Sequence, residues 1–326
     1  MPEPTYTLMR PTTPEHIERG LVCLVGGPVP ADPERARQLA AGVHVPVERF
    51  LAYAREIGLG PERQVQAGDA THTVAGMCLW VPSPGRTAML FTPPMHDFPD
   101  AAAASTACVK AALADAAATG ITLVQALLDP EDTAGRAMFA AAGLGVLTTL
   151  EYMERHATLL PPPAPSDRDL PPGFRLQAYR PELEGLFVDA ILASYQQTLD
   201  CPALSGLRDI TDVIAGHKAV GDFDPNLWFL LTEHERPVGC LLLARVPARS
   251  AMDLVYLGLG PAARGRGLGR LLLQRLLYEM YRHGMATASL SVDEINIPAR
   301  KLYRRFGFTT VARRLAMITI LNKSIC

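Results

Sequence analysis

The second half of the chain alternates apolar runs and polar turns in the order of a mixed α/β domain. Two apolar runs flank the polar turn EHERP and a third follows, which predicts strands at residues 227–232, 238–245 and 254–260. Leucines then recur at helical spacing over residues 268–283, and Gly284 supplies a stop for that helix. A strand at 288–292, a short helix at 298–305 and a last strand at 311–321 complete the predicted domain.

The first half repeats this order more loosely. Strands are predicted at 73–81, 87–91 and 121–128, and an alanine-rich helix at 101–118. The likeness is specific at one place, where DTAGRAMFAAAGL (132–144) aligns with NIPARKLYRRFGF (296–308). This alignment sets Asp132 against Asn296, Phe139 against Tyr303 and Gly143 against Gly307. We interpret the two segments as traces of an internal duplication.

A proline-rich stretch divides the two halves. The run LPPPAPSDRDLPPG at 160–173 lacks backbone donors and favours extended conformations, so neither a helix nor a central strand continues through it. A length of 326 residues suits two domains that each bury a core. We therefore expect a first domain at 1–160, a linker at 161–172 and a second domain at 173–326.

The composition is that of an ordinary globular protein, with 48% hydrophobic and 20% charged residues. No apolar stretch reaches the roughly 18 residues of a membrane-spanning helix, and the N-terminus does not resemble a signal peptide, so a cytoplasmic protein without membrane partners is expected. The six cysteines show no metal-ligand spacing, and no metal is expected. Residues 166–326 hold 20 Lys/Arg against 16 Asp/Glu, a surplus too small to indicate nucleic acid but compatible with a ligand bearing several phosphates.

The most informative segment is LGLGPAARGRGLGRLLLQRLL at 257–277, where a strand ends in a turn rich in glycine and arginine that opens a helix. The first N–H groups of a helix have no intrahelical partner and its dipole favours anions, so phosphate oxygens fit against residues 265–269. Glycine allows close approach and positive φ there, while Arg264 and Arg266 would add charge-assisted contacts. Two other interpretations are a tight structural turn with surface arginines and a dinucleotide fingerprint of an oxidoreductase. The fingerprint GxGxxG fails because Arg270 stands at the third glycine position.

The run Arg264-x-x-Gly267-x-Gly269 resembles the acetyl-CoA pyrophosphate motif of the GNAT superfamily, and NxxAxxLYxxxGF at 296–308 is similar to that family's second motif. The duplicated order is similar to tandem-GNAT proteins, a group that includes mycothiol synthases. The resemblance implies an α/β fold of two GNAT-like domains in tandem, each a central mixed, mostly antiparallel sheet flanked by helices.

The resemblance also implies acetyl-CoA as co-substrate and a role for each matching residue. Leu257, Gly258 and Leu259 would pair with the pantetheine arm, and Asn296 would contact the same arm further on. Tyr303 would be the general acid for the departing thiolate. The pyrophosphate would be held by Arg264, Gly265, Arg266, Gly267, Leu268, Gly269 and Arg270. Without the resemblance, Tyr303 reads as a residue packed against the sheet and Asn296 as a helix cap.

The acceptor is expected to bind against the variable segment 194–228. Tyr195, Asp200, His217, Asp222 and Asp224 are the predicted contacts of a cationic amine, although turn capping explains the aspartates equally well. The general base stays open between Asp253, Glu233, Asp200 and a chain of waters. The acceptor would be a small-molecule amine or a peptide N-terminus, and the chain a monomer or homodimer.

The first half lacks the corresponding phosphate turn. Residues 92–105 read TPPMHDFPDAAAAS without a glycine, and Phe139 has no proton to give where the second half has Tyr303. We therefore expect an N-acetyltransferase with one active site in the C-terminal domain, which transfers acetyl directly in a ternary complex. The alternative is a non-catalytic acyl-CoA-binding sensor or partner protein, and the retention of Tyr303 argues against it.

Overall fold

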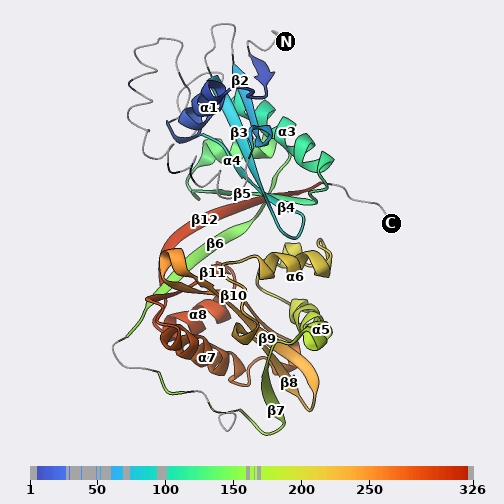
Figure 1. Ribbon diagram of the computed structural model, residues 1–326. Coiled ribbons are helices and arrows are strands. Elements are labelled where there is room, and N and C mark those ends of the chain that lie inside the picture. The colour runs from blue at the N-terminus through green and yellow to red at the C-terminus, as the bar shows by residue number, and fades with distance from the viewer. Residues whose placement is uncertain are drawn as a thin grey trace. The chain divides into compact units, whose positions relative to one another are not determined.

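The computed structural model describes residues 6–26, 29, 38, 49, 52, 60–68, 74–93, 101–158, 162–164, 166 and 170–321. The chain forms two compact units, each with its own hydrophobic core. Unit 1 contains Met1–Leu147 and Leu315–Cys326, and unit 2 contains Thr148–Arg314 (Figure 1).

Unit 1 is a mixed sheet flanked by helices. Its strands lie in the order β1 (Thr7–Met9), β2 (Gln64–Gly68), β3 (Val74–Ser83), β4 (Thr87–Phe91), β5 (Leu123–Leu128) and the end of β12 (Thr309–Ile320). Only the β4–β5 pair is parallel among the pairs described in this unit. The helices are α1 (Pro14–Gly26), α3 (Ala101–Ala118) and α4 (Thr133–Ala141).

The alanines of α3 favour a helix and let it lie close to the sheet. The closest approach is at Gly76 on β3, where an added Cβ would lie 2.7 Å from the Ser105 backbone nitrogen. A side chain at position 76 would therefore push α3 away from the sheet.

Unit 2 has the same type of sheet. Its strands lie in the order β6 (Gly145–His156), β11 (Thr287–Asp293), β10 (Ala251–Leu259), β9 (Arg236–Val246), β8 (Trp228–Glu233) and β7 (Phe174–Ala178). Among the pairs described in this unit, only β10–β11 is parallel. The helices are α5 (Glu184–Tyr195), α6 (Ile210–Lys218), α7 (Leu268–Arg282) and α8 (Ile297–Arg305).

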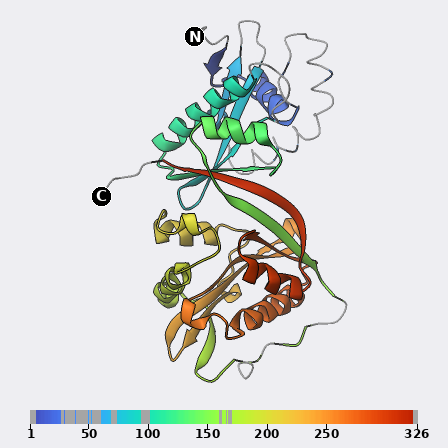
Figure 2. The same ribbon diagram turned by 180° about the vertical axis from the view of Figure 1, so that it is seen from behind.

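Both faces of the unit 2 sheet are buried. Along β8 and β9, Phe229, Leu241 and Leu243 pack with the α7 and α8 side chains, while Trp228 and Leu242 on the opposite face pack with α5 and α6. Figure 2 shows α7 and α8 side by side in this unit. Because successive strand residues point to opposite faces, a sheet covered on both sides needs the continuous apolar runs found in the sequence.

Two strands pair with strands from the other half of the sequence. Residues Leu150–His156 of β6 come from the first half of the chain but pair with β11 in unit 2, and Leu315–Ile320 of β12 come from the end of the chain but pair with β5 in unit 1. The compact units are therefore not two consecutive stretches. The division into residues 1–160, 161–172 and 173–326 stays a prediction, and part of its linker lies outside the described residues.

The predicted fold class is confirmed in both units, and the duplicated segments adopt the same local structure. Asp132 caps α4 by accepting from the Gly135 backbone N–H, and Asn296 caps α8 by accepting from the Ala299 N–H. Each helix ends before a glycine with positive φ, Gly143 at 103° and Gly307 at 82°. Such a glycine is the usual end of a helix because other residues resist this conformation.

No helix in the described part of the chain is long and apolar enough to cross a membrane. Within the same residues, no group of three or more His, Cys, Asp or Glu side chains is arranged to hold a metal ion.

Candidate active site

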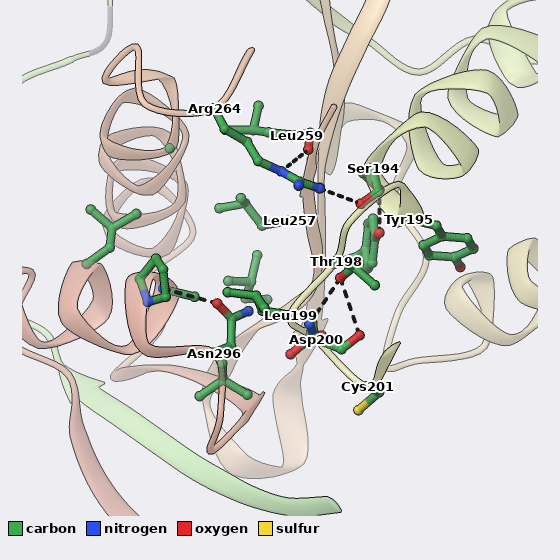
Figure 3. A pocket seen from close by; sticks show the side chains of 18 of the residues that line it. Ser194, Tyr195, Thr198, Leu199, Asp200, Cys201, Leu257, Leu259, Arg264 and Asn296 are labelled. Carbon is green, nitrogen blue, oxygen red and sulfur yellow. Dashed lines mark hydrogen bonds between the residues drawn. The ribbon is translucent and has the colours of Figure 1, made fainter. Parts of the chain in front are cut away.

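A cavity of about 990 Å³ opens in unit 2 where β10 leaves β11. The two strands pair only from Ala251–Asp253 to Thr287–Ser289. Leu254 then pairs with Leu243 and Tyr256 with Leu242 on β9, so Val255 is an extra residue that forms a β-bulge. The cavity is lined by the outer part of β10, the turn into α7, α8 and the segment 194–208 (Figure 3).

The turn into α7 has the shape of an anion cradle. Gly265 and Gly267 adopt positive φ of 73° and 78°, and Gly267 is the N-cap of α7. A Cβ added at either glycine would meet nothing within 4 Å, so the protein's own packing does not require glycine there. Both glycines line the cavity together with Gly269. The space in front of these backbone N–H groups is thus open to a phosphate.

The arginines of this segment have different roles. The Arg264 guanidinium donates to the backbone carbonyls of Leu259 at 3.0 Å and Ser194 at 2.8 Å, as Figure 3 shows, and to that of Gln197 at 3.1 Å. Arg264 thus holds the turn against the end of α5. Because its guanidinium nitrogens already donate to backbone carbonyls, few of its N–H groups remain for a phosphate. Arg270 is exposed and lines the cavity.

Two predicted pyrophosphate residues have side chains that do not line the cavity. Arg266 pairs with Glu233 at 3.0 Å and lies over the Phe174 ring at 4.6 Å. Leu268 is buried in the core. Only their backbone groups are available for the predicted contact. Arg305 at the end of α8 lines the cavity and was not predicted, since nothing in its sequence context marks it.

The predicted pantetheine strand lines the cavity at Leu257, Gly258 and Leu259. On one edge these residues pair with β9, and the described pairing with β11 on the other edge has already ended at Asp253. An extended ligand can therefore pair with the backbone of this free edge. Gly258 is required here because an added Cβ would lie 2.6 Å from the Ser194 Oγ atom.

Tyr303 and Asn296 both line the cavity from α8. Burial raises the pKa of the Tyr303 phenol well above its usual value, and the charge of Asp200 adds to this, so the phenol stays protonated at neutral pH. Its ring packs against Phe308. The Asn296 side chain caps α8 and also hydrogen-bonds to Asp200. Tyr303 thus packs against a neighbouring ring and Asn296 caps a helix, and both residues also line the cavity.

The predicted acceptor residues separate into two groups. Tyr195, Asp200 and His217 line the cavity, whereas Asp222 and Asp224 do not. The Asp222 backbone N–H donates to the Arg245 carbonyl at 2.7 Å. The cavity wall also contains Tyr256, whose ring lies 5.3 Å from that of His217. Sequence reasoning did not select Tyr256, although a hydroxyl-bearing residue in an otherwise apolar strand was a signal that it faces the cavity.

His217 is a neutral imidazole at physiological pH because burial lowers its pKa to about 4, with a further contribution from Arg208. Its Nε2 atom is buried and has no hydrogen-bond partner within the residues that the structure describes. A ligand group can supply that partner.

The three candidate bases are placed very differently. Asp253 accepts from Arg249 at 2.8 Å and from Ser289, and Glu233 pairs with Arg266. Neither lines the cavity. Asp200 does, and the loop that carries it is held by Asp293.

Cys201, next to Asp200, is an unreactive thiol at neutral pH. Burial, together with the charges of Asp200 and Asp293, raises its pKa to about 12. Since the thiolate is the nucleophilic form, Cys201 is not suited to covalent catalysis.

Comparison with known proteins relates a segment of unit 2 to a known family. Residues 197–308 match the model of the Acetyltransferase (GNAT) family, a range that contains the glycine turn, Asn296 and Tyr303. This segment of unit 2 is therefore similar to the GNAT family. The match confirms the family resemblance that the two motifs indicated.

The chain is also similar to curated relatives. It is 34% identical to the mycothiol acetyltransferase of Streptomyces bingchenggensis over 185 residues, which cover 55% of this chain and 56% of the relative. It is 40% identical to the mycothiol acetyltransferase of Beutenbergia cavernae over 93 residues, or 28% of this chain and 31% of the relative. The matched region thus spans about half, or less, of each relative's length.

A solved structure extends the GNAT fold to the whole chain. The GCN5-related N-acetyltransferase from Sphaerobacter thermophilus aligns with 100% of this chain and 98% of its own, with a TM-score of 0.58 and 19% identity. At this identity the likeness concerns the fold. It supports the tandem arrangement of two GNAT-like units.

Proposed function

We propose that unit 2 transfers an acetyl group from acetyl-CoA to an amine in a ternary complex, at a single active site. The observation that carries the proposal is that one cavity brings together the open glycine cradle, the free edge of β10 and the protonated Tyr303 phenol. These are the elements needed to hold a phosphate-bearing thioester and to protonate its leaving group.

The cofactor site uses backbone groups more than side chains. The N–H groups at Gly265, Gly267 and Gly269 would hold the pyrophosphate, with Arg270 as the side-chain cation. Backbone groups of Leu257–Leu259 would pair with the pantetheine arm, and Asn296 would contact it further along. Arg264 would act indirectly, by fixing the turn through the carbonyls it binds.

The reaction then needs one acid and no covalent enzyme intermediate. Acetyl-CoA supplies the activated acyl group. The Tyr303 hydroxyl would protonate the departing thiolate, and a backbone N–H of β10 would stabilise the negative charge that develops on the carbonyl oxygen.

The acceptor is proposed to be a small-molecule amine or a peptide N-terminus. Because matched relatives bear the name mycothiol acetyltransferase, a thiol-sugar amine belongs in the first panel of acceptors, beside polyamines, amino acids and an N-terminal peptide. Residues 94–100 of the glycine-free stretch in unit 1 lie outside the described residues, but Phe139, buried where unit 2 has Tyr303, supports one active site.

The test is release of the CoA thiol from acetyl-CoA, measured with a thiol reagent for each amine of the panel. Acetylation is verified by mass spectrometry of the acceptor. Turnover with at least one amine supports the proposal. Tight binding of acetyl-CoA without release by any amine would favour the alternative of a non-catalytic acyl-CoA-binding protein.

A further inference from the structure

We propose that Asp200 receives the ammonium group of the acceptor and removes its first proton, with the Tyr256 hydroxyl oxygen as the second ligand of that ammonium. This inference rests on the proposed acetyl transfer. It specifies the acceptor class as a primary alkylammonium, and it assigns the general base of the reaction.

The first observation is that Asp200 lies in the cavity where the reaction is proposed to take place. Asp200 lines the same cavity as Tyr303; part of the residue reaches the surface, while its carboxylate lies among the cavity walls. Its charge is close enough to raise the pKa values of both Tyr303 and Tyr256. A carboxylate that lines the same cavity as the acid is accessible to the amine of a ternary complex.

The second observation is the surroundings of the carboxylate. Asp200 accepts from the backbone N–H of Asp293 at 3.1 Å and from the Asn296 side chain. Burial among the cavity walls raises its pKa, and the Asp293 charge adds to this, against the opposing effect of the two hydrogen bonds. The titratable groups around it are Asp293 on β11, Tyr303 on α8, Tyr256 on β10 and the neighbouring thiol of Cys201. A carboxylate with a raised pKa is a better proton acceptor than an ordinary aspartate.

The third observation fixes the direction of a hydrogen bond. The Ser194 hydroxyl donates its single proton to the Ile191 carbonyl at 2.6 Å. The 2.6 Å contact between Ser194 Oγ and the Tyr256 hydroxyl must then use the tyrosine proton. The Tyr256 oxygen is left with lone pairs only, so it can accept from a cation and has no proton to offer.

The loop that carries Asp200 is fixed by a buried carboxylate. Asp293 has no exposed surface, and its Oδ2 accepts from the Cys201 backbone N–H at 2.9 Å. Its Oδ1 accepts from Thr148 on β6 at 2.6 Å. Cys201 is held at a φ of 44°, a strained conformation for a residue other than glycine. Asp293 is therefore the positioning residue for Asp200.

The protons of the acceptor amine are all accounted for over one turnover. The acceptor binds as an ammonium and gives one proton to Asp200, which passes it to solvent. The neutral amine forms the C–N bond as the C–S bond breaks, and Tyr303 protonates the thiolate. The second amine proton returns to the Tyr303 oxygen, so that one proton is released per turnover.

The experiment compares Asp200→Asn with wild type on two acceptors of matched size, a primary alkylamine and an alkoxyamine. The alkoxyamine is already neutral at pH 7 and needs no base. We expect kcat/KM for the alkylamine to fall at pH 7 by about 100-fold, to recover as the pH approaches the pKa of the amine, and to change little for the alkoxyamine. Asp189→Asn, on the exposed side of α5 and outside the cavity, is the matched control.

Calorimetry with acetyl-CoA accompanies the kinetics and should give the same affinity for all three proteins. Equal losses on both amines, or an unchanged rate on the alkylamine, would overturn the assignment of Asp200 while leaving the acetyltransferase proposal in place. No transfer by the wild type to any amine would overturn the proposed function and this inference with it. A parallel Tyr256→Phe variant should raise KM for the alkylamine more than it lowers kcat.

Discussion

At the residue scale, replacing Tyr303 tests whether its hydroxyl protonates the leaving thiolate. Tyr303→Phe keeps the ring that packs against Phe308 but removes the hydroxyl. We expect acetyl-CoA affinity and thermal stability to stay at wild-type values, and kcat to fall by about 100-fold. Steady-state kinetics and calorimetry on the same preparation measure this. A wild-type kcat would show that another group protonates the thiolate.

Two arginines of the α7 turn look equivalent in sequence but should behave oppositely. Arg264→Gln removes hydrogen bonds to the carbonyls of Leu259 and Ser194, and should lower the free energy of unfolding by about 2 kcal/mol. Arg270→Gln should leave stability within about 0.5 kcal/mol and weaken acetyl-CoA binding about tenfold. Urea denaturation and calorimetry measure the two quantities. Equal stability losses would contradict the division of roles.

The difference between these arginines also shows where sequence reasoning stops. The segment 257–270 and the motif containing Asn296 and Tyr303 could be placed at one site because local motifs fix a strand end and a helix start. The direction of each arginine side chain depends on partners far away in the chain, Ser194 for Arg264 and Glu233 for Arg266. Those partners leave no local signal.

At the element scale, the start of α7 contains a glycine whose replacement should weaken ligand binding more than it weakens the fold. Gly267 has φ of 78° with open space where a Cβ would stand. Gly267→Ala should therefore cost about 1 kcal/mol of stability through backbone strain, while acetyl-CoA affinity falls by more than tenfold because the methyl group occupies the phosphate position. Gly284→Ala, at the other end of the helix with φ of 64° and similar open space, is the matched control. Equal acetyl-CoA affinities of Gly267→Ala and Gly284→Ala would contradict phosphate binding at the start of α7.

The elements themselves were the most predictable part of the fold. The helix at 101–118 and the strand at 87–91 have the predicted bounds, because alanine content and a short apolar run specify them locally. Strand partners were not predictable. Nothing in residues 145–156 indicates pairing with a strand more than a hundred residues later, since register and partner depend on the tertiary structure.

At the scale of the whole molecule, β6 makes unit 2 depend on the first half of the chain. Glu151 on β6 is buried and binds Arg300 on α8 through two contacts of 2.5 and 3.0 Å, while Arg304 adds a third. Glu151→Gln should lower stability by about 3 kcal/mol because it weakens a buried ion pair. Glu154→Gln on the same strand is the control.

The Glu151 ion pair also predicts a pH dependence. Burial acts to raise the pKa of Glu151, but the hydrogen bonds and charges of Arg300 and Arg304 outweigh it and lower the pKa. Its contribution is therefore complete above the unfolded value of about 4.3 and is lost as the pH falls through the lower folded value. The stability difference between wild type and Glu151→Gln should shrink in urea melts between pH 5 and pH 3. A difference that grows on acidification would have the wrong sign for this account.

The most direct test of the central claim is calorimetric titration of the full chain with acetyl-CoA, beside Gly267→Trp and with NADH as a control ligand. The account predicts one acetyl-CoA per wild-type chain, no binding to the variant and no binding of NADH. Two acetyl-CoA per chain, or unchanged binding to the variant, would contradict a single cofactor site at the start of α7.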